Sequence, residues 1–119
     1  MSYVDGFIVP VPKKKRAAYV AMARKACKVW KDHGALDYHE CVADDVSWGK
    51  RTSFPRSVKL KGSEAVWFSW IVYRNRKHRD SVMKKVMKDK RLASMMDIKK
   101  MPFDAKRMIF GGFKAVVNM

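Results

Sequence analysis

The segment Ala-Val-Trp-Phe-Ser-Trp-Ile-Val-Tyr at residues 65–73 constrains the fold more than any other part of the chain. It is short and rich in aromatic and β-branched residues, which is typical of a β-strand buried on both faces. Successive strand side chains point to opposite faces, so Phe68 and Trp70 lie on one face while Trp67 and Tyr73 lie on the other. The helices of a small domain cover only one such face. We therefore expect a second copy of the chain to cover the other.

The flanking segments predict a mixed α+β domain that spans residues 1–119. Apolar residues at helical spacing alternate with strand-like runs in the order strand, helix, strand, strand, helix, strand, which is the order of a ferredoxin-like fold. This order predicts a four-stranded antiparallel sheet with helices on one side, and the mixed faces of the second strand indicate an edge strand. The expected strands are 3–11, 36–43, 65–73 and 106–117, with a short extended piece at 57–61, and the expected helices lie between Pro12 and Gly34, after Asn75, and as one shorter turn at 91–96.

The charge balance of the chain is strongly basic, with 27 Lys and Arg residues against 11 Asp and Glu residues and a net charge of +16. Such a charge attracts nucleic acid nonspecifically. The basic residues are dispersed along solvent-facing helix sides and loops, which favours a basic solvated surface over a dedicated groove. RNA-recognition domains share the strand order, but segment 65–73 contains none of the Lys, Arg or Gly of their aromatic signature.

The compartment is inferred from what the sequence lacks. No segment approaches the roughly 18 apolar residues of a membrane helix, and the first residues show no secretory signal, so we expect no membrane partner and a cytoplasmic location. Cys27 and Cys41 have neither metal-ligand nor redox-motif spacing, and we expect them to be reduced.

Five sequence motifs resemble those of the YbaA-like family of small bacterial proteins, and they occur in order over nearly the whole chain. The resemblance implies a ferredoxin-like subunit of the dimeric α+β barrel type. It implies no activity, since the family is one of unknown function. The motifs are Tyr-Val-Asp-Gly-Phe at 3–7, Glu-Cys-Val-Ala-Asp-Asp-Val at 40–46, Thr-Ser-Phe-Pro at 52–55, Phe-Ser-Trp-Ile-Val-Tyr at 68–73 and Met-Pro-Phe-Asp-Ala-Lys-Arg-Met-Ile-Phe-Gly-Gly-Phe at 101–113.

Asp5 is the candidate catalytic residue, because it is a carboxylate within an apolar strand. Such a group either finds a cationic partner or shifts its pKa upward, as general bases do. An ion pair with Arg107 or Lys106 is the alternative, and structural pairs of this kind are the more common outcome.

The resemblance to dimeric α+β barrels implies that a small molecule can bind between the sheet and its helices, where polar groups beside apolar walls form such sites. The turn at 104–107 presents charge beside aromatic residues, where it can bind an anionic or carbonyl ligand or pin an interface. We take Trp70, Tyr73, Asp104 and Arg107, together with Asp5, as the candidate ligand-binding residues.

A metal site is not expected, because His39 and Glu40 are adjacent in a strand and point to opposite faces. The sequence implies no cofactor either, since it contains no nucleotide-binding glycine loop.

Three functional hypotheses remain. The first is a homodimer, closed through its sheet faces, that binds or transforms a small molecule between sheet and helices. The second is a structural or partner-binding dimer with a filled interior. The third, which we rank last, is a basic nucleic-acid-binding protein. The sequence does not decide whether the protein is an enzyme.

Overall fold

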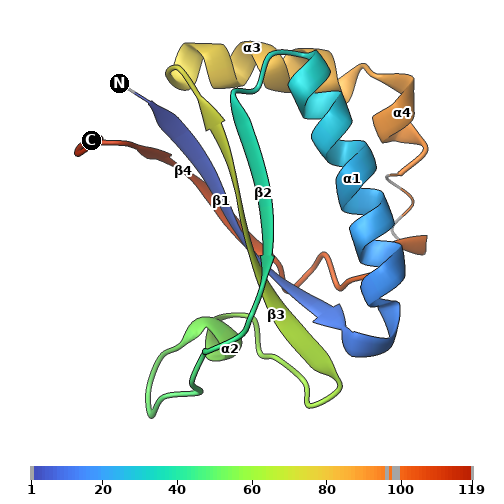
Figure 1. Cartoon of the computed structure of the whole chain (residues 1–119), viewed down its shortest axis with the longest axis vertical. Coiled ribbons are helices and arrows are strands. Elements are labelled where there is room, and N and C mark those ends of the chain that lie inside the picture. The colour runs from blue at the N-terminus through green and yellow to red at the C-terminus, as the bar shows by residue number, and fades with distance from the viewer. Residues whose placement is uncertain (1, 96, 98–99, 119) are drawn as a thin grey trace.

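The computed structural model describes residues 2–95, 97 and 100–118 and contains an antiparallel sheet with helices packed on one side (Figure 1). The strand order is β2-β3-β1-β4, and each neighbouring pair is antiparallel. This is the arrangement of a ferredoxin-like subunit, which confirms the predicted α+β class. The elements are β1 (Tyr3–Pro12), the 3₁₀ turn η1 (Lys13–Lys15), α1 (Arg16–Asp32), β2 (Asp37–Val42), α2 (Phe54–Ser57), β3 (Glu64–Tyr73), α3 (Arg76–Met87), α4 (Lys90–Ala93) and β4 (Ile109–Lys114).

Strand β3 has the two apolar faces that its sequence predicts. Trp67 pairs with Val9 and faces the helices, whereas Trp70 pairs with Gly6 and faces away from them. On the helix side Trp67 is buried and Tyr73 is fully buried. Strand β2 alternates between exposed and half-buried residues and forms one edge of the sheet, as expected.

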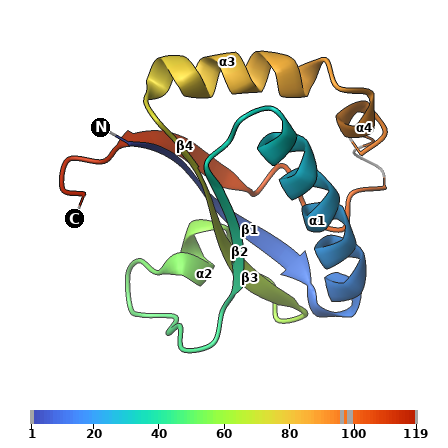
Figure 2. The same cartoon turned by 45° about the horizontal axis from the view of Figure 1, so that its top comes forward.

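Helices α1 and α3 cover the same face of the sheet, which Figure 2 shows from a second direction. The Asn75 side chain caps α3 by accepting a hydrogen bond from the His78 backbone N–H at 2.8 Å, as an N-terminal Asn is expected to do. Val82 and Val86 of α3 are buried. Met87, at the end of the same helix, is 58% exposed.

Two hydrophobic clusters fill the space between the sheet and the helices. One cluster joins Tyr73 and Ile71 to Val29 of α1 and to Val82 and Val86 of α3. The other lies at the opposite end of α1 and consists of Val9, Val11, Tyr19, Ala23 and Trp67. The core therefore lies on one side of the sheet.

The expected extended piece at 57–61 is wrong, because the chain forms the short helix α2 and a turn there. The Ser53 side chain accepts a hydrogen bond from the Arg56 backbone N–H at 3.1 Å, and Pro55 lies in the first turn, where its missing N–H costs nothing. Lys59 then takes a positive φ of 50°, which ends any extended conformation.

The last strand and the last helix are shorter than expected. Strand β4 begins at Ile109 and not at Lys106, because a turn closed by the Arg107 N–H and the Asp104 carbonyl precedes it. The predicted helical turn at 91–96 is α4, and Met96 lies outside the described residues. None of the described helices is long and apolar enough to cross a membrane.

Candidate functional site

A groove of about 350 Å³ separates helix α1 from strands β2 and β3. One stripe of α1 supplies its wall, because residues three and four positions apart share a helix face. The alternate residues of β2 that face the helix supply the other wall, and β3 contributes Trp67. The lining residues are Arg16, Val20, Ala23, Arg24, Cys27, Tyr38, Glu40, Val42 and Trp67.

Glu40 is the polar centre of this groove. Its Oε1 accepts a hydrogen bond from the Tyr19 hydroxyl at 2.8 Å, and its Oε2 accepts one from the Tyr38 hydroxyl at 3.3 Å. Burial raises the pKa of the Glu40 carboxyl above its usual value, although the two phenol hydrogen bonds oppose that shift. Within the described part of the chain, Glu40 forms no ion pair.

The tyrosines hold the Glu40 carboxylate and are not themselves acids at neutral pH. Burial and the neighbouring Glu40 raise the pKa of both Tyr19 and Tyr38 well above that of a free phenol. Their hydroxyls therefore stay protonated and act as donors. Tyr19 also packs on Trp67, with ring centroids 4.9 Å apart, which fixes the floor of the groove.

Arg16 and Arg24 lie on the groove stripe of α1, and both are exposed. The Arg16 guanidinium lies over the Trp67 ring, 5.8 Å from its centroid, which places a cation at the apolar wall. Neither arginine belongs to the ion pairs formed among the described residues.

Asp5 forms the structural ion pair that the sequence allowed for, but its partner is neither Arg107 nor Lys106. The Arg79 Nη1 lies 2.7 Å from the Asp5 Oδ1. Burial raises the pKa of the Asp5 carboxyl, while Arg79 and a hydrogen bond from Tyr73 lower it. The sequence could not indicate this partner, since the two residues are 74 positions apart.

Tyr73 lies beside Asp5 on the helix side, where it is fully buried. Its hydroxyl accepts a hydrogen bond from the Trp30 indole N–H at 3.2 Å. Burial and the nearby Asp5 raise its pKa. Asp5 and Tyr73 are thus brought together, but in packed core and not along the groove.

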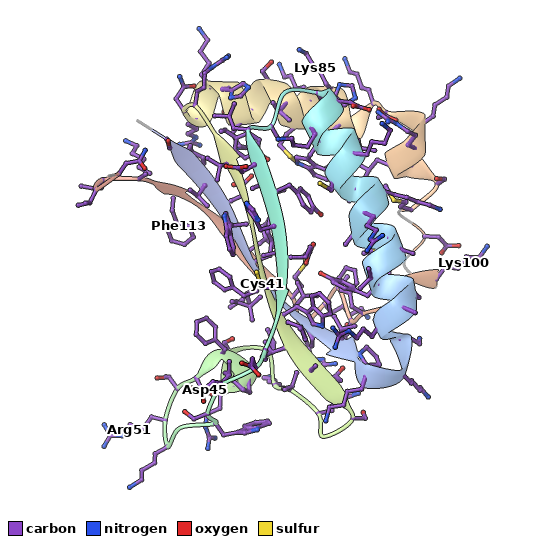
Figure 3. The ribbon with its side chains drawn as sticks, in the orientation of Figure 1. Cys41, Asp45, Arg51, Lys85, Lys100 and Phe113 are labelled. Carbon is purple, nitrogen blue, oxygen red and sulfur yellow. The ribbon has the colours of Figure 1, made fainter. Side chains whose placement is uncertain are left out.

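Trp70 lies on the other side of the sheet, away from Asp5 and Tyr73. We call this side the open face, and it carries Val4, Gly6, Ile8, Phe68, Trp70, Ile109, Gly111 and Phe113 around a shallow hollow of about 620 Å³. The His39 ring stacks on Trp70 with centroids 4.8 Å apart. Phe68 and Phe113 are 43% and 65% exposed, so large aromatic side chains face solvent in the single chain, and Figure 3 shows Phe113 on the side of the sheet away from the helices.

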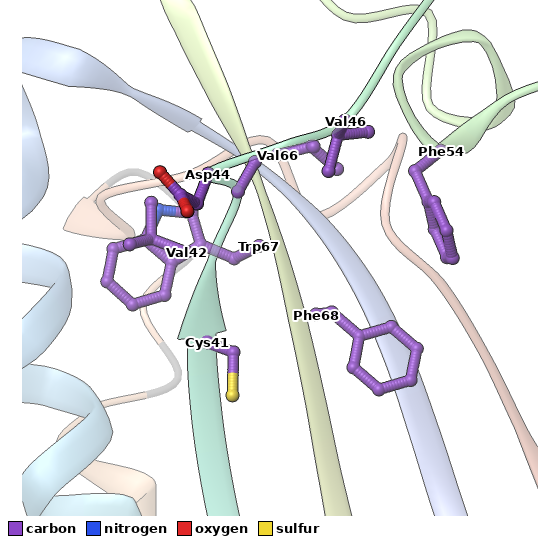
Figure 4. Close-up of a pocket in the computed structure, with 9 residues that line it drawn as sticks. Cys41, Val42, Asp44, Val46, Phe54, Val66, Trp67 and Phe68 are labelled. Atoms are coloured by element: carbon purple, nitrogen blue, oxygen red, sulfur yellow. The ribbon is translucent and has the colours of Figure 1, made fainter.

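A second hollow of about 280 Å³ lies beside the open face, between the end of β2, the loop that follows it and the first half of β3 (Figure 4). Phe54 of α2 and Phe68 of β3 meet there edge to face, with centroids 5.9 Å apart. Asp44 is the one acidic residue of its lining, whose other members besides these two rings are Cys41, Val42, Ala43, Val46, Val66 and Trp67. In Figure 1 this loop lies on the side of the sheet opposite the helices, so it borders the open face.

Asp104 and Arg107 form a separate charged cluster with Glu64. Arg107 Nε lies 2.8 Å from the Asp104 Oδ2, and its Nη1 lies 2.9 Å from the Glu64 Oε1. Hydrogen bonding to Arg107 lowers the pKa of both Glu64 and Asp104. This geometry joins the turn before β4 to the start of β3 within one chain, and none of the three residues lines the groove.

The sequence pattern indicated Glu40 only as a metal-capable side chain and gave no sign of the groove around it. The structure confirms that His39 and Glu40 point to opposite faces, since His39 stacks on Trp70 while Glu40 meets Tyr19. No group of three or more His, Cys, Asp or Glu side chains suited to a metal ion occurs among residues 2–95, 97 and 100–118. The sequence feature that could have indicated the groove is a single acid, Glu40, on the same strand face as Tyr38 and Val42, opposite a helix stripe that carries two arginines.

The comparisons with known proteins agree with the resemblance seen in the motifs. The family model described as "Protein of unknown function (DUF1428)" matches residues 2–105. The uncharacterized protein YbaA of Escherichia coli strain K12 is 47% identical over 118 residues, which cover 99% of each chain. YbaA of Shigella flexneri gives the same values. Among solved structures, the de novo designed protein Foldit4 is 12% identical, covers 99% of this chain and 100% of its own, and has a TM-score of 0.44.

Proposed function

Since the chain belongs to the DUF1428 family of proteins of unknown function, we propose a function from its own geometry. It is a homodimer that is closed through the open face and binds a small molecule in the groove between each sheet and its helix α1. The observation that carries the binding function is Glu40, a half-buried carboxylate that lines an open groove and has two phenol donors but no described cationic partner. Carboxylates that only stabilise a fold are usually paired.

The charge distribution supports a second copy as the cover of the open face. The chain carries a net charge of +16, so two copies repel each other through most of their surface. The strand positions of the open face contain no Lys or Arg. Their titratable residues are Asp37, His39 and Cys41 on the edge strand β2 and Glu64 at the start of β3, which is paired with Arg107. Two copies can therefore meet on this face with little repulsion and bury exposed aromatic rings, each worth roughly 150 to 250 Å².

The same charge distribution argues against nucleic-acid recognition on the sheet. Single-stranded nucleic acid binds sheets that combine stacking aromatics with cations along the backbone path. Here the strand positions of the open face carry aromatics without Lys or Arg, and the exposed cations beside it, such as Arg51 and Arg56, lie on the bordering loop and not along the strands. Exposed lysines such as Lys25, Lys28 and Lys84 lie on the helices of the opposite side. Nonspecific attraction of nucleic acid to the helix layer follows from this charge and should be lost as salt is raised.

A cytoplasmic location is part of the proposal. Cys27 and Cys41 are free, and Cys41 is exposed. Exposed free thiols fit a reducing compartment.

The test of the dimer is the molar mass in solution. We expect twice the chain mass of 13.8 kDa by multi-angle light scattering. Trp70→Glu should reduce the mass to one chain, because it buries a charge at the centre of the interface. Met87→Glu is the matched control, since Met87 is an exposed apolar residue on the helix side and its change should leave the dimer intact.

The test of binding is native mass spectrometry of gently purified protein. A bound small molecule should be retained by the wild-type protein and retained to a smaller extent by Glu40→Gln. A monomer at high concentration, with Trp70 open to a quencher, would overturn the dimer. A dimer that never retains or binds a small molecule would instead support the structural or partner-binding alternative.

A further inference from the structure

We infer that the groove beside Glu40 binds a small hydroxylated organic acid, with the hydroxyl donating to Glu40 and the anionic group held by Arg16 and Arg24. This inference rests on the proposed function and adds the chemical class of the ligand. Three features of the groove lead to it: an acceptor at its centre, cations on one wall, and apolar surface between them.

The centre of the groove has free acceptor capacity. Each oxygen of an ionised carboxylate can accept about two hydrogen bonds. Tyr19 uses one position on Oε1 of Glu40, and Tyr38 uses one on Oε2. The remaining lone pairs favour a ligand group that donates, such as a hydroxyl, and disfavour a second anion at this point.

The cationic wall suits an anion. Arg16 and Arg24 are eight residues apart on α1, so they lie on one face about two turns apart. Guanidinium groups bind carboxylates and phosphates through paired hydrogen bonds. Both arginines are exposed and lack an ion-pair partner among the described residues, so their donors are available to a ligand.

The charge of the groove also favours a monoanion. Arg16 and Arg24 contribute two positive charges and ionised Glu40 contributes one negative charge, which leaves one positive charge to be neutralised. The net charge of +16 on the whole chain raises the local concentration of small anions further.

The apolar walls and the volume limit the size of the ligand. Val20, Ala23, Val42 and Trp67 lie along the groove and offer contact to a ring or a short hydrocarbon chain. A volume of about 350 Å³ lies near the lower end of ligand sites, which span roughly 300 to 1,000 Å³. The ligand class is therefore a single-ring or short-chain hydroxy acid.

The experiment measures binding of matched probes to the full-length protein labelled with 5-fluorotryptophan. The four tryptophans are expected to give separate ¹⁹F signals; Trp70 lies on the open face, whereas Trp67 lines the groove and also the smaller hollow of about 280 Å³. A Trp67 shift is therefore assigned to the groove only where substitution of Arg16, Arg24 or Glu40 changes the binding that it reports. The probes are 4-hydroxybenzoate, 4-hydroxybenzamide, which lacks the charge, and benzoate, which lacks the hydroxyl. Substitution of Trp67 and Trp70 by Phe, one at a time, assigns their signals.

We expect 4-hydroxybenzoate to shift the Trp67 signal and to bind about tenfold more tightly than either of the other probes, as one lost charged or polar contact implies. The double variant Arg16→Gln, Arg24→Gln should bind 4-hydroxybenzoate and 4-hydroxybenzamide equally. Glu40→Gln should lose the preference for the hydroxyl while it keeps the preference for the charge. Lys25→Gln with Lys28→Gln is the control, because it removes two positive charges from α1 outside the groove lining and should leave both preferences in place.

The outcomes separate this inference from the proposed function on which it rests. Equal binding of all three probes at Trp67 would overturn the hydroxy-acid inference but leave small-molecule binding in the groove standing. A shift confined to Trp70 would place the probes on the open face and overturn both binding claims. No shift at either tryptophan would also overturn both, while the dimer would still be decided by its mass.

Discussion

Arg107→Met should destabilise the fold much more than the same exchange at Lys106, the other basic residue of the 104–107 turn. Arg107 and Glu64 form an ion pair whose side chains are only 17% and 5% exposed. The same guanidinium donates to the Val58 and Lys59 carbonyls and to Asp104, so one side chain joins three segments of the chain. Its removal leaves the Glu64 carboxylate buried without a cation.

The magnitude follows from that unpaired charge. Loss of one partner from a buried pair costs about 3 to 5 kcal/mol. Glu64 keeps a hydrogen bond from the Lys61 backbone N–H at 2.8 Å, and Arg107 is partly exposed, so we expect about 2 to 3 kcal/mol here. With a urea m-value of about 1.5 kcal/mol per M for a chain of this size, the unfolding midpoint should fall by roughly 1.3 to 2 M.

The assay is urea unfolding followed by circular dichroism at one fixed protein concentration, since a dimer makes the midpoint concentration-dependent. Lys106→Met is the control, because Lys106 is exposed and its change should cost less than about 0.5 kcal/mol. Glu64→Gln should cost less than Arg107→Met, because Arg107 would still donate to Asp104 and to the two carbonyls. Equal midpoints for Arg107→Met and Lys106→Met would refute the reasoning.

Three further predictions concern single residues and use the same unfolding assay. Gly112→Ala should destabilise the protein by about 1 to 3 kcal/mol, because a Cβ at this position would clash with the Tyr3 ring. An unchanged unfolding midpoint would contradict this prediction. Gly34→Ala should cost about 1 kcal/mol, since Gly34 has a φ of 111° and ends helix α1. Glu40→Gln should be at least as stable as the wild type at pH 7. Burial raises the pKa of Glu40 in the folded state above the ordinary value of 4.5, so ionisation of Glu40 lowers the stability of the wild type as the pH rises above about 4.5. The gap between Glu40→Gln and the wild type should narrow as pH falls toward that value, whereas a clear loss of stability at pH 7 would make Glu40 a structural residue.

The sequence was sufficient for the sheet because strand periodicity is a local signal. Trp67 and Trp70 are three positions apart in an apolar run, so alternation alone places them on opposite faces, as the structure confirms. The edge position of β2 followed from the polar residues on both of its faces. The Ser53 cap and Pro55 are local sequence signals for the start of helix α2, but they were not used when an extended piece was predicted at 57–61.

The polar contacts could not be predicted in the same way, because they join residues far apart in the chain. Asp5 was expected to pair with a residue of the last strand, which is its sheet neighbour, but Arg79 reaches it from helix α3. Arg107 was treated as a ligand-binding candidate, and its contacts with Glu64 depend on how the loop before β3 packs. A sequence pattern gives the face of each side chain, and only the packing of the elements gives its partner.

The two proposals depend on strand β3 without depending on each other. Trp67 lines the groove on the helix side and Trp70 lies on the open face, so the backbone of β3 lies between the two rings. A partner chain on the open face therefore cannot contact a ligand beside Glu40 directly, and a ligand in the groove leaves the open face apolar and uncovered. A dimer without a ligand and a ligand-binding monomer are both physically consistent with this fold. The dimer therefore has to be judged by mass and the groove by binding, and success of one test is no evidence for the other.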